Sequence, residues 1–244
     1  MSGALLAVLA GSVVAALIKG TLGLGFPIIA TPVAAHVLGV REAVVVLLLP
    51  NMLMDGVLIF RDGVPVALIR RLAVLLGSLA LGIVLGSTLL AVLSPRALSL
   101  ILGLLLLFYV VASVVELPLP RDLDRPPILA VTGFCSGVSG GVANTTGPVI
   151  AVYLQVLLAD KREFVTAFGL ASFLGKVVQM LSAYGWHLYT PANLGFSALL
   201  VVPIMVAFWF GLRIQDRINQ ALFARLVHVL LLVSGVSLIY RAVA

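Results

Sequence analysis

Long apolar runs separated by short polar connections fill almost the whole chain. Stretches without any charged residue cover 72–93, 97–115, 126–159 and 177–212. A helix needs about 20 mostly apolar residues to cross the hydrocarbon part of a bilayer, so several of these runs are long enough to span it. Ten apolar segments are predicted to be helices: 3–18, 26–38, 43–60, 66–93, 97–115, 128–141, 147–159, 164–184, 191–212 and 219–240.

Composition supports an integral membrane protein of the all-α class. Hydrophobic residues make up 62% of the 244 residues and charged residues 10%, whereas soluble domains are about 45–50% apolar and 25% charged. The first apolar run lacks a basic leader, so we interpret it as a membrane segment and not as a signal peptide. The net charge of +6 comes from basic residues spread singly over the connections, which argues against nucleic-acid binding. The single cysteine, Cys135, excludes an internal disulfide.

The chain is predicted to contain two homologous halves, 1–115 and 128–244, joined by a charged linker at 116–127. At an offset of 121 residues, Pro27 aligns with Pro148, Gly20 with Gly141 and Arg41-Glu42 with Arg162-Glu163. At an offset near 125, Pro65 aligns with Pro191 (one residue further) and Gly86 with Gly211. The apolar segments keep the same order throughout, which indicates a duplication.

Each half is predicted to begin with a broken helix pair. The glycine-rich stretches 19–27 and 139–148 separate two short apolar segments in each half. Glycine destabilises helix interiors, whereas proline favours the first turn of a helix, so new helices are expected to begin near Pro27 and Pro148. Each half therefore carries a helix, a break and a second short helix.

The charges of the connections bear on topology. If each broken pair crosses the membrane once, the 13 lysines and arginines other than Lys19 and Lys176 divide seven to six between the two sides. If each pair forms a hairpin, the second half is inverted and the division becomes ten to three. Basic residues concentrate on the cytoplasmic side, so the inverted repeat with both termini outside is favoured. Tyr184, Trp186 and Tyr189 would then lie in an outer interfacial belt.

Interrupted helices in inverted repeats are typical of transporters, whose substrate sites lie at the interface between the repeats. Unpaired backbone N–H groups and the helix dipole attract anions to a helix N-terminus. Irregular backbone at membrane depth must be buried in protein or line a wet cavity. We therefore expect both breaks to face the interior and to form an anion site.

The two break regions resemble the paired glycine-rich signatures of the sulfite exporter TauE/SafE family. The similarity is carried by GSVVAALIKGTLGLGFPIIATPVAAHVLG (11–39) and TGFCSGVSGGVANTTGPVIAVYL (132–154), and the two-half layout extends it over nearly the whole chain. Lys19, Thr21, Leu22 and Leu24 interrupt the first glycine run, which is richer in glycine in typical members. The resemblance implies transport of small sulfur-containing anions and seven to nine spans built from a duplicated four-span unit. A four-span unit crosses the membrane an even number of times, which would make the two halves parallel and not inverted. Both topologies therefore remain open.

Candidate site residues are polar or glycine residues at the breaks and charged or amide residues inside apolar segments. The candidate substrate-binding residues are Lys19, Gly20, Thr21, Gly23, Gly25, Asn51, Gly140, Gly141, Asn144, Thr145, Thr146, Lys176 and Gln179, and Asp55 is the candidate coupling residue. Lysine inside a membrane segment is costly and indicates function. Each candidate also has a structural interpretation. Lys19 could extend to the membrane interface, and Asp55 could lie at that interface. Asn144–Thr146 could cap a helix, and Asn51 and Gln179 could form hydrogen bonds between helices.

The leading hypothesis is a secondary transporter for small anions such as sulfite or organosulfonates, working by alternating access about this central site. An anion channel and a structural or chaperone-like membrane subunit are the alternatives. No Walker motif is present, and Ser136 and Ser139 have no evident base, so neither an ATPase nor an intramembrane enzyme is favoured. We expect no cofactor and no metal, because His36, His187 and His228 lack ligand spacing. The expected location is a bacterial inner membrane, with proton coupling and homo-oligomerisation left open.

Overall fold

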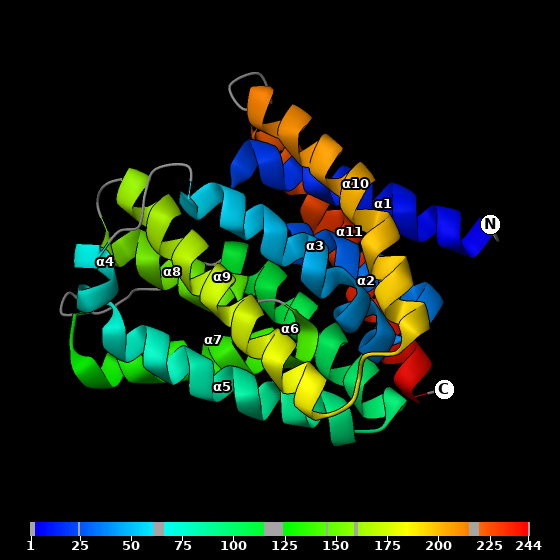
Figure 1. The fold of residues 1–244 in the computed structure, drawn as a ribbon, viewed down its shortest axis with the longest axis horizontal. Coiled ribbons are helices and arrows are strands. Elements are labelled where there is room, and N and C mark those ends of the chain that lie inside the picture. The colour runs from blue at the N-terminus through cyan, green and yellow to red at the C-terminus, as the bar shows by residue number, and fades with distance from the viewer. Residues whose placement is uncertain are drawn as a thin grey trace.

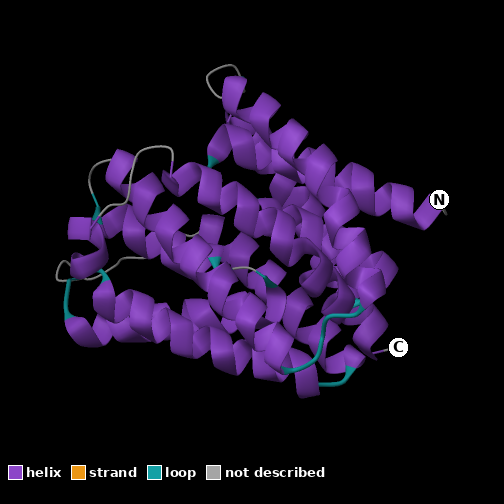
Figure 2. Cartoon of the chain, viewed as in Figure 1, coloured by secondary structure: helices purple, strands orange, loops and turns teal. Residues whose placement is uncertain are grey.

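The computed structural model describes residues 3–23, 25–60, 66–114, 124–144, 146–158, 161–214 and 220–243. Within these ranges the chain is all-α and contains no strand (Figure 2). The helices are α1 (Gly3–Leu22), α2 (Phe26–Leu38), α3 (Val40–Phe60), α4 (Val66–Arg71), α5 (Ala73–Val92), α6 (Pro95–Val114), α7 (Pro126–Ala143), α8 (Gly147–Leu157), α9 (Lys161–Gly185), α10 (Pro191–Arg213) and α11 (Gln220–Val243). The predicted all-α class is confirmed.

Most predicted segments match a helix to within a few residues. Three differ. The segment 66–93 forms two helices, α4 and α5, which meet at Leu72. The segments 3–18 and 128–141 were predicted too short, because α1 continues to Leu22 and α7 to Ala143. Glycine therefore does not end these helices where it first appears, and each break is shorter than the sequence indicated.

The two predicted breaks are present, between α1 and α2 and between α7 and α8. At the first, Gly23 (φ 78°) and Gly25 (φ 103°) adopt left-handed backbone conformations that only glycine takes readily. At the second, Asn144 (φ 61°) adopts the left-handed conformation that asparagine tolerates better than most residues. Pro27 and Pro148 stand in the first turn of α2 and α8, as predicted.

The α1–α2 pair is a hairpin. A Cβ on Gly25 would touch Ile18, and one on Gly11 would touch Val33, so positions on α1 meet positions on α2 in opposite chain order. This antiparallel packing is the condition on which the inverted topology was favoured. It describes the first pair only, and the inversion of the second half stays a prediction.

Glycines allow two pairs of helices to pack backbone to backbone. Helices α5 and α7 run side by side (Figure 1), and a Cβ on Gly82, Gly86, Gly137 or Gly141 would overlap the backbone of the partner helix. Helices α1 and α10 meet in the same manner, where Gly20 and Gly211 face each other. Such contacts are typical of membrane helices, in which small residues bring backbones close enough for dense packing.

The two glycine contacts are equivalent in detail. Gly86 faces Gly141 and the Val138 carbonyl, whereas Gly211 faces Gly20 and the Leu17 carbonyl. The alignment of the two halves equates Gly86 with Gly211 and Gly20 with Gly141. This agreement is what a duplicated chain would give, although the duplication itself stays a prediction.

Each predicted half contributes a helix to the core of the other. Helix α5 packs on α7 and α9, and α10 packs on α1 and α3. Accordingly, one apolar core involves mainly α1, α2, α3, α6 and α10, and the second mainly α5, α7, α8 and α9. The chain segments 1–115 and 128–244 therefore interlock in space.

The outer surface is apolar, as a lipid-facing surface must be. Leu81 on α5 is 69% exposed, and Leu199 and Val202 on α10 are 61% and 67% exposed. Five helical stretches are long and apolar enough to cross a membrane: Val40–Phe60, Ala73–Val92, Pro126–Ala143, Thr166–Gly185 and Pro191–Arg213. The chain is thus an integral membrane protein.

We predict that Gly86→Val destabilises the protein by about 1–3 kcal/mol, because the added side chain must push α5 away from the α7 backbone. Gly77→Val on the same helix is the control, since nothing lies within 4 Å of a Cβ placed there. The thermal midpoint of the detergent-purified protein measures the effect. Equal midpoints for the two variants would contradict the proposed close packing.

Candidate functional site

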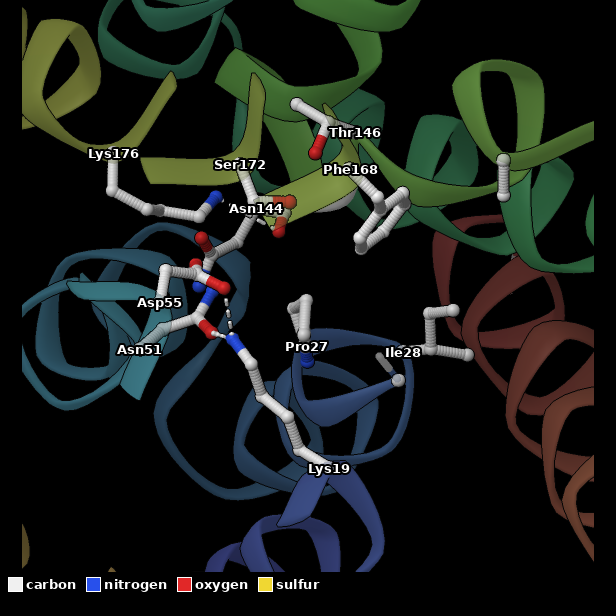
Figure 3. A pocket seen from close by; sticks show the side chains of 12 residues that line it. Lys19, Pro27, Ile28, Asn51, Asp55, Asn144, Thr146, Phe168, Ser172 and Lys176 are labelled. Carbon is white, nitrogen blue, oxygen red and sulfur yellow. Dashed lines mark hydrogen bonds and ion pairs between the residues drawn. The ribbon is translucent and has the colours of Figure 1, made fainter. Parts of the chain in front are cut away.

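The two helix breaks face a single buried cavity. Residues from α1, α2, α3, the second break, α8 and α9 line it: Lys19, Gly25, Pro27, Ile28, Asn51, Asp55, Asn144, Thr146, Ala151, Phe168, Ser172 and Lys176. The space that the centre of a water molecule can reach is about 30 Å³, room for about two waters. Figure 3 shows Lys19, Asn51 and Asp55 on one side and Lys176, Ser172 and Thr146 on the other. The two breaks thus share one small cavity.

Lys19 forms a compact ion pair inside the cavity. Its Nζ donates to Asp55 Oδ1 and to Asn51 Oδ1, both at 2.6 Å (Figure 3). Lys19 stands in the last turn of α1, whereas Asn51 and Asp55 lie one turn apart on the same face of α3. The pair holds the break end of α1 against α3. The Lys19 and Asp55 side chains are 3% and 1% exposed, so Lys19 does not extend to the surface as a snorkelling lysine would, and Asp55 is not surface-exposed.

Lys176 is buried without a carboxylate partner among the described residues. Its Nζ donates to the Asn144 carbonyl and to Gln179 Oε1, both at 3.1 Å, and its side chain is 1% exposed. Its acceptors are therefore neutral dipoles. A buried ammonium whose hydrogen-bond acceptors are all neutral retains an attraction for an anion.

The contact between α3 and α9 brings Lys176 to the same cavity as Asp55. The ring of Phe60 on α3 meets the ring of Phe173 on α9 edge to face, with centroids 5.6 Å apart. On their respective helices, Asp55 lies five residues before Phe60 and Lys176 lies three residues after Phe173. Among the described residues the cavity lining therefore contains two lysines and one aspartate, which gives a formal net charge of +1.

Two polar groups of the cavity have unused hydrogen-bonding capacity. Asn144 is fully buried, and neither Oδ1 nor Nδ2 has a partner within the described structure. Asp55 Oδ2 also has none, although Oδ1 accepts from Lys19. Buried polar atoms are nearly always satisfied in folded proteins, so such atoms lining a cavity indicate a ligand or water there.

The N-terminal turns of α2 and α8 line the cavity. Gly25, Pro27 and Ile28 come from the start of α2, and Thr146 precedes the first residue of α8. Neither helix start has a side-chain cap, so the first backbone N–H groups carry the unshielded positive end of each helix dipole. Capping of α8 by Asn144 or Thr146, one interpretation of these residues, is not observed: Asn144 is the C-cap of α7.

The structure brings seven of the predicted site residues together: Lys19, Gly25, Asn51, Asp55, Asn144, Thr146 and Lys176. It places six others outside the cavity lining: Gly20, Thr21, Gly23, Gly140, Gly141 and Gln179. Thr145 lies outside the described residues.

The residues outside the lining support the breaks. Gly20 and Gly141 contact the backbones of α10 and α5, respectively, and Gly140 faces Thr146. Thr21 Oγ1 donates to the Ile18 carbonyl. Gln179 Nε2 donates to the Gly140 and Gly141 carbonyls at 3.0 Å, and Gln179 thereby joins α9 to the end of α7.

Five lining residues were not predicted as site residues: Pro27, which was predicted only as a helix start, and Ile28, Ala151, Phe168 and Ser172. The repeat offset of 121 residues equates Ser172 with Asn51, so the alignment contained a signal for Ser172. Ile28, Ala151 and Phe168 carry no such signal, because they cannot be told from core residues by type alone.

The family assignment follows from the chain as a whole. A family model described as Sulfite exporter TauE/SafE matches residues 7–238, which include both breaks and every lining residue of the cavity. The chain belongs to the sulfite exporter TauE/SafE family. No match was found among curated proteins or solved structures. The TauE/SafE family is a membrane transporter family and not an enzyme class, so the cavity is a transport site candidate and not a catalytic one.

We predict that Asp55→Leu destabilises this TauE/SafE protein by about 3–5 kcal/mol, because the substitution leaves the Lys19 ammonium buried without its carboxylate. The double variant Lys19→Met, Asp55→Leu should recover most of the loss, since it removes both charges and keeps the volume. Thermal midpoints in detergent measure both. A double variant no more stable than Asp55→Leu would show that the pair is not the source of the effect.

Proposed function

We propose that the protein is a secondary transporter that carries small sulfur-containing anions, such as sulfite or organosulfonates, through the cavity between the two breaks. The observation that carries the proposal is Lys176, a buried ammonium with only neutral acceptors beside two uncapped helix starts. The family is named for sulfite export, which supports an oxyanion as the substrate.

Lys176 is the proposed cationic ligand of the substrate. An anion in the cavity would replace neutral dipoles by a full opposite charge, which compensates the burial of the ammonium. Lys19 has a carboxylate already, so its proposed contribution is secondary, through the position of Asn51 and Asp55. Asn144 Nδ2 and Thr146 are proposed as further donors to substrate oxygens. Thr145 remains a proposed ligand from the sequence alone.

The helix starts are proposed to complete the anion shell. Backbone N–H groups at the start of α2 and α8 carry the positive end of the helix dipole, which favours anions without adding a titratable group. Proline at the second position of each helix fixes the backbone for the first turn, and the N–H groups of the neighbouring residues remain as donors. The neutral donors would bind substrate oxygens, while Lys176 would supply the attraction.

Alternating access is proposed to occur by movement of two tight helix pairs. The backbone contacts of α5 with α7 and of α1 with α10 favour movement of each pair as a unit. The cavity lies where α1 ends and where α7 ends, so a shift of one pair relative to the other would open it toward either side. Asp55, the carboxylate of the cavity, is the proposed coupling residue.

We predict saturable counterflow of labelled sulfite or a small organosulfonate in proteoliposomes. Lys176→Ala should lower the transport efficiency, kcat/KM, by about 10- to 100-fold, the value of a hydrogen bond to a charged group. Ser197→Ala is the matched control, because Ser197 is equally buried but bonds to the Val46 carbonyl away from the cavity. Saturable flux of no tested anion would exclude a transporter, and unsaturable flux without counterflow would indicate the channel alternative.

A second prediction follows from the net charge of the cavity. With both lysines and Asp55 ionised, a bound monoanion neutralises the site, whereas the empty site keeps a single buried positive charge that is costly to move through the membrane. Exchange of labelled for unlabelled substrate should therefore exceed net uptake by about tenfold or more, as a difference of 1.4 kcal/mol in the barrier suffices for that factor. Parallel measurements in the same vesicles, loaded or empty, test this. Equal rates would contradict a charged empty carrier.

A further inference from the structure

The cavity has unused acceptors as well as donors. Asp55 Oδ2 and Asn144 Oδ1 both lack hydrogen-bond partners within the described structure, and both side chains are at most 1% exposed. An anion made only of acceptor oxygens would satisfy the donors, Lys176 Nζ and Asn144 Nδ2. It would leave the Asp55 oxygen without a partner and would repel it. Burying an acceptor without a hydrogen-bond partner costs free energy, and the cost is larger when the acceptor is charged.

From these contacts, and on the basis of the transport function proposed above, we infer that the substrate is a singly charged oxyanion that also carries an O–H or N–H donor, which it directs at Asp55. Hydrogen sulfite and small hydroxy- or amino-substituted sulfonates belong to this class. Sulfite as a dianion and sulfate do not. The negative end of the substrate faces Lys176 and the donor faces the carboxylate.

The charge of the cavity supports the same assignment. Lys19, Lys176 and Asp55 give a net charge of one, so a monoanion neutralises the site and a dianion overcompensates it. In a buried site an uncompensated charge of either sign is unfavourable. The charge count adds the two lysines to the argument from the unpaired Asp55 oxygen, and both select a protonated, singly charged anion.

Lys19 fixes which oxygen of Asp55 is offered to the substrate. The Lys19 Nζ donates to Asp55 Oδ1 at 2.6 Å, and the same ammonium donates a second hydrogen bond to Asn51 Oδ1. The ion pair is thus a positioning device. It leaves Oδ2 as the acceptor that remains for a ligand, and Figure 3 shows Asp55 and Asn144 lying toward one another in the cavity.

A matched pair of substrates tests the inference. Hydroxymethanesulfonate and ethanesulfonate have the same charge, the same sulfonate and the same number of non-hydrogen atoms, and differ in one hydroxyl against one methyl group. Competition with labelled substrate in counterflow, in weakly acidic buffer where the hydroxymethanesulfonate adduct does not dissociate, gives their relative affinities. We expect the wild-type protein to favour hydroxymethanesulfonate by about tenfold, the worth of one net hydrogen bond to a charged group.

Asp55→Asn should remove this preference and admit sulfate. Lys19 needs an acceptor, so the new amide must turn its oxygen to Lys19 and its NH₂ group to the cavity. The acceptor for the hydroxyl is then lost, and the net charge of the site rises by one. Sulfate, expected not to compete in the wild type, should then compete. Ser197→Ala should keep the wild-type preference.

The outcomes separate this inference from the proposed function. If the wild type carries both sulfonates with equal affinity, the inference is overturned and the transport function stands. The same holds if Asp55→Asn folds, transports and keeps the preference for the hydroxyl. If neither sulfonate competes and no labelled anion enters, the proposed function fails first. Should Asp55→Asn not yield folded protein, the wild-type comparison decides alone.

Discussion

The burial of ionised side chains within a bundle of apolar helices is the constraint on which the centre of this protein depends. Lys19 meets it with a carboxylate and an amide oxygen at 2.6 Å, whereas Lys176 meets it with two neutral acceptors. A carbonyl outside a helix has no intrahelical donor, so both of its lone pairs are available to a side chain. The break at Asn144 supplies such a carbonyl, so the interruption of α7 and α8 and the charge of Lys176 are parts of one arrangement.

Close backbone packing fixes the position of that arrangement. Gly20 follows Lys19 and contacts α10, and Gly141 precedes Asn144 by three residues and contacts α5. Each glycine therefore holds the end of a helix immediately before its break. Side chains larger than glycine at these positions would displace the helix ends, and with them the ammonium of Lys19 and the carbonyl of Asn144. The glycines predicted as substrate ligands thus act through the residues beside them.

Sequence reasoning predicted the fold class, the breaks and much of the cavity because each has a strong local cause. Charges within apolar runs identified Lys19, Asp55 and Lys176, and proline after glycine located the starts of α2 and α8. The predicted ends of α1 and α7 were wrong because the sequence does not distinguish a glycine that permits close helix packing from a glycine that ends a helix. The split at Leu72 has no Gly or Pro signal, and Ile28, Ala151 and Phe168 resemble core residues. Such distinctions depend on tertiary neighbours, which a single sequence does not contain.

The Lys19–Asp55 pair links the stability of the fold to the selectivity proposed for the site. The pair joins α1 to α3, and the same carboxylate reduces the charge of the cavity and offers its second oxygen to a ligand. Replacing both members by apolar residues is compatible with folding, since buried ion pairs often contribute little net stability over well-packed hydrocarbon. Such a replacement would nevertheless leave the net charge of the cavity unchanged while removing its carboxylate acceptor. An apolar pair would thus preserve the attraction for an anion but would no longer distinguish anions that carry an O–H or N–H donor from those that do not. This loss is a physical reason for a transporter to retain a costly ion pair where hydrocarbon would hold the helices equally well.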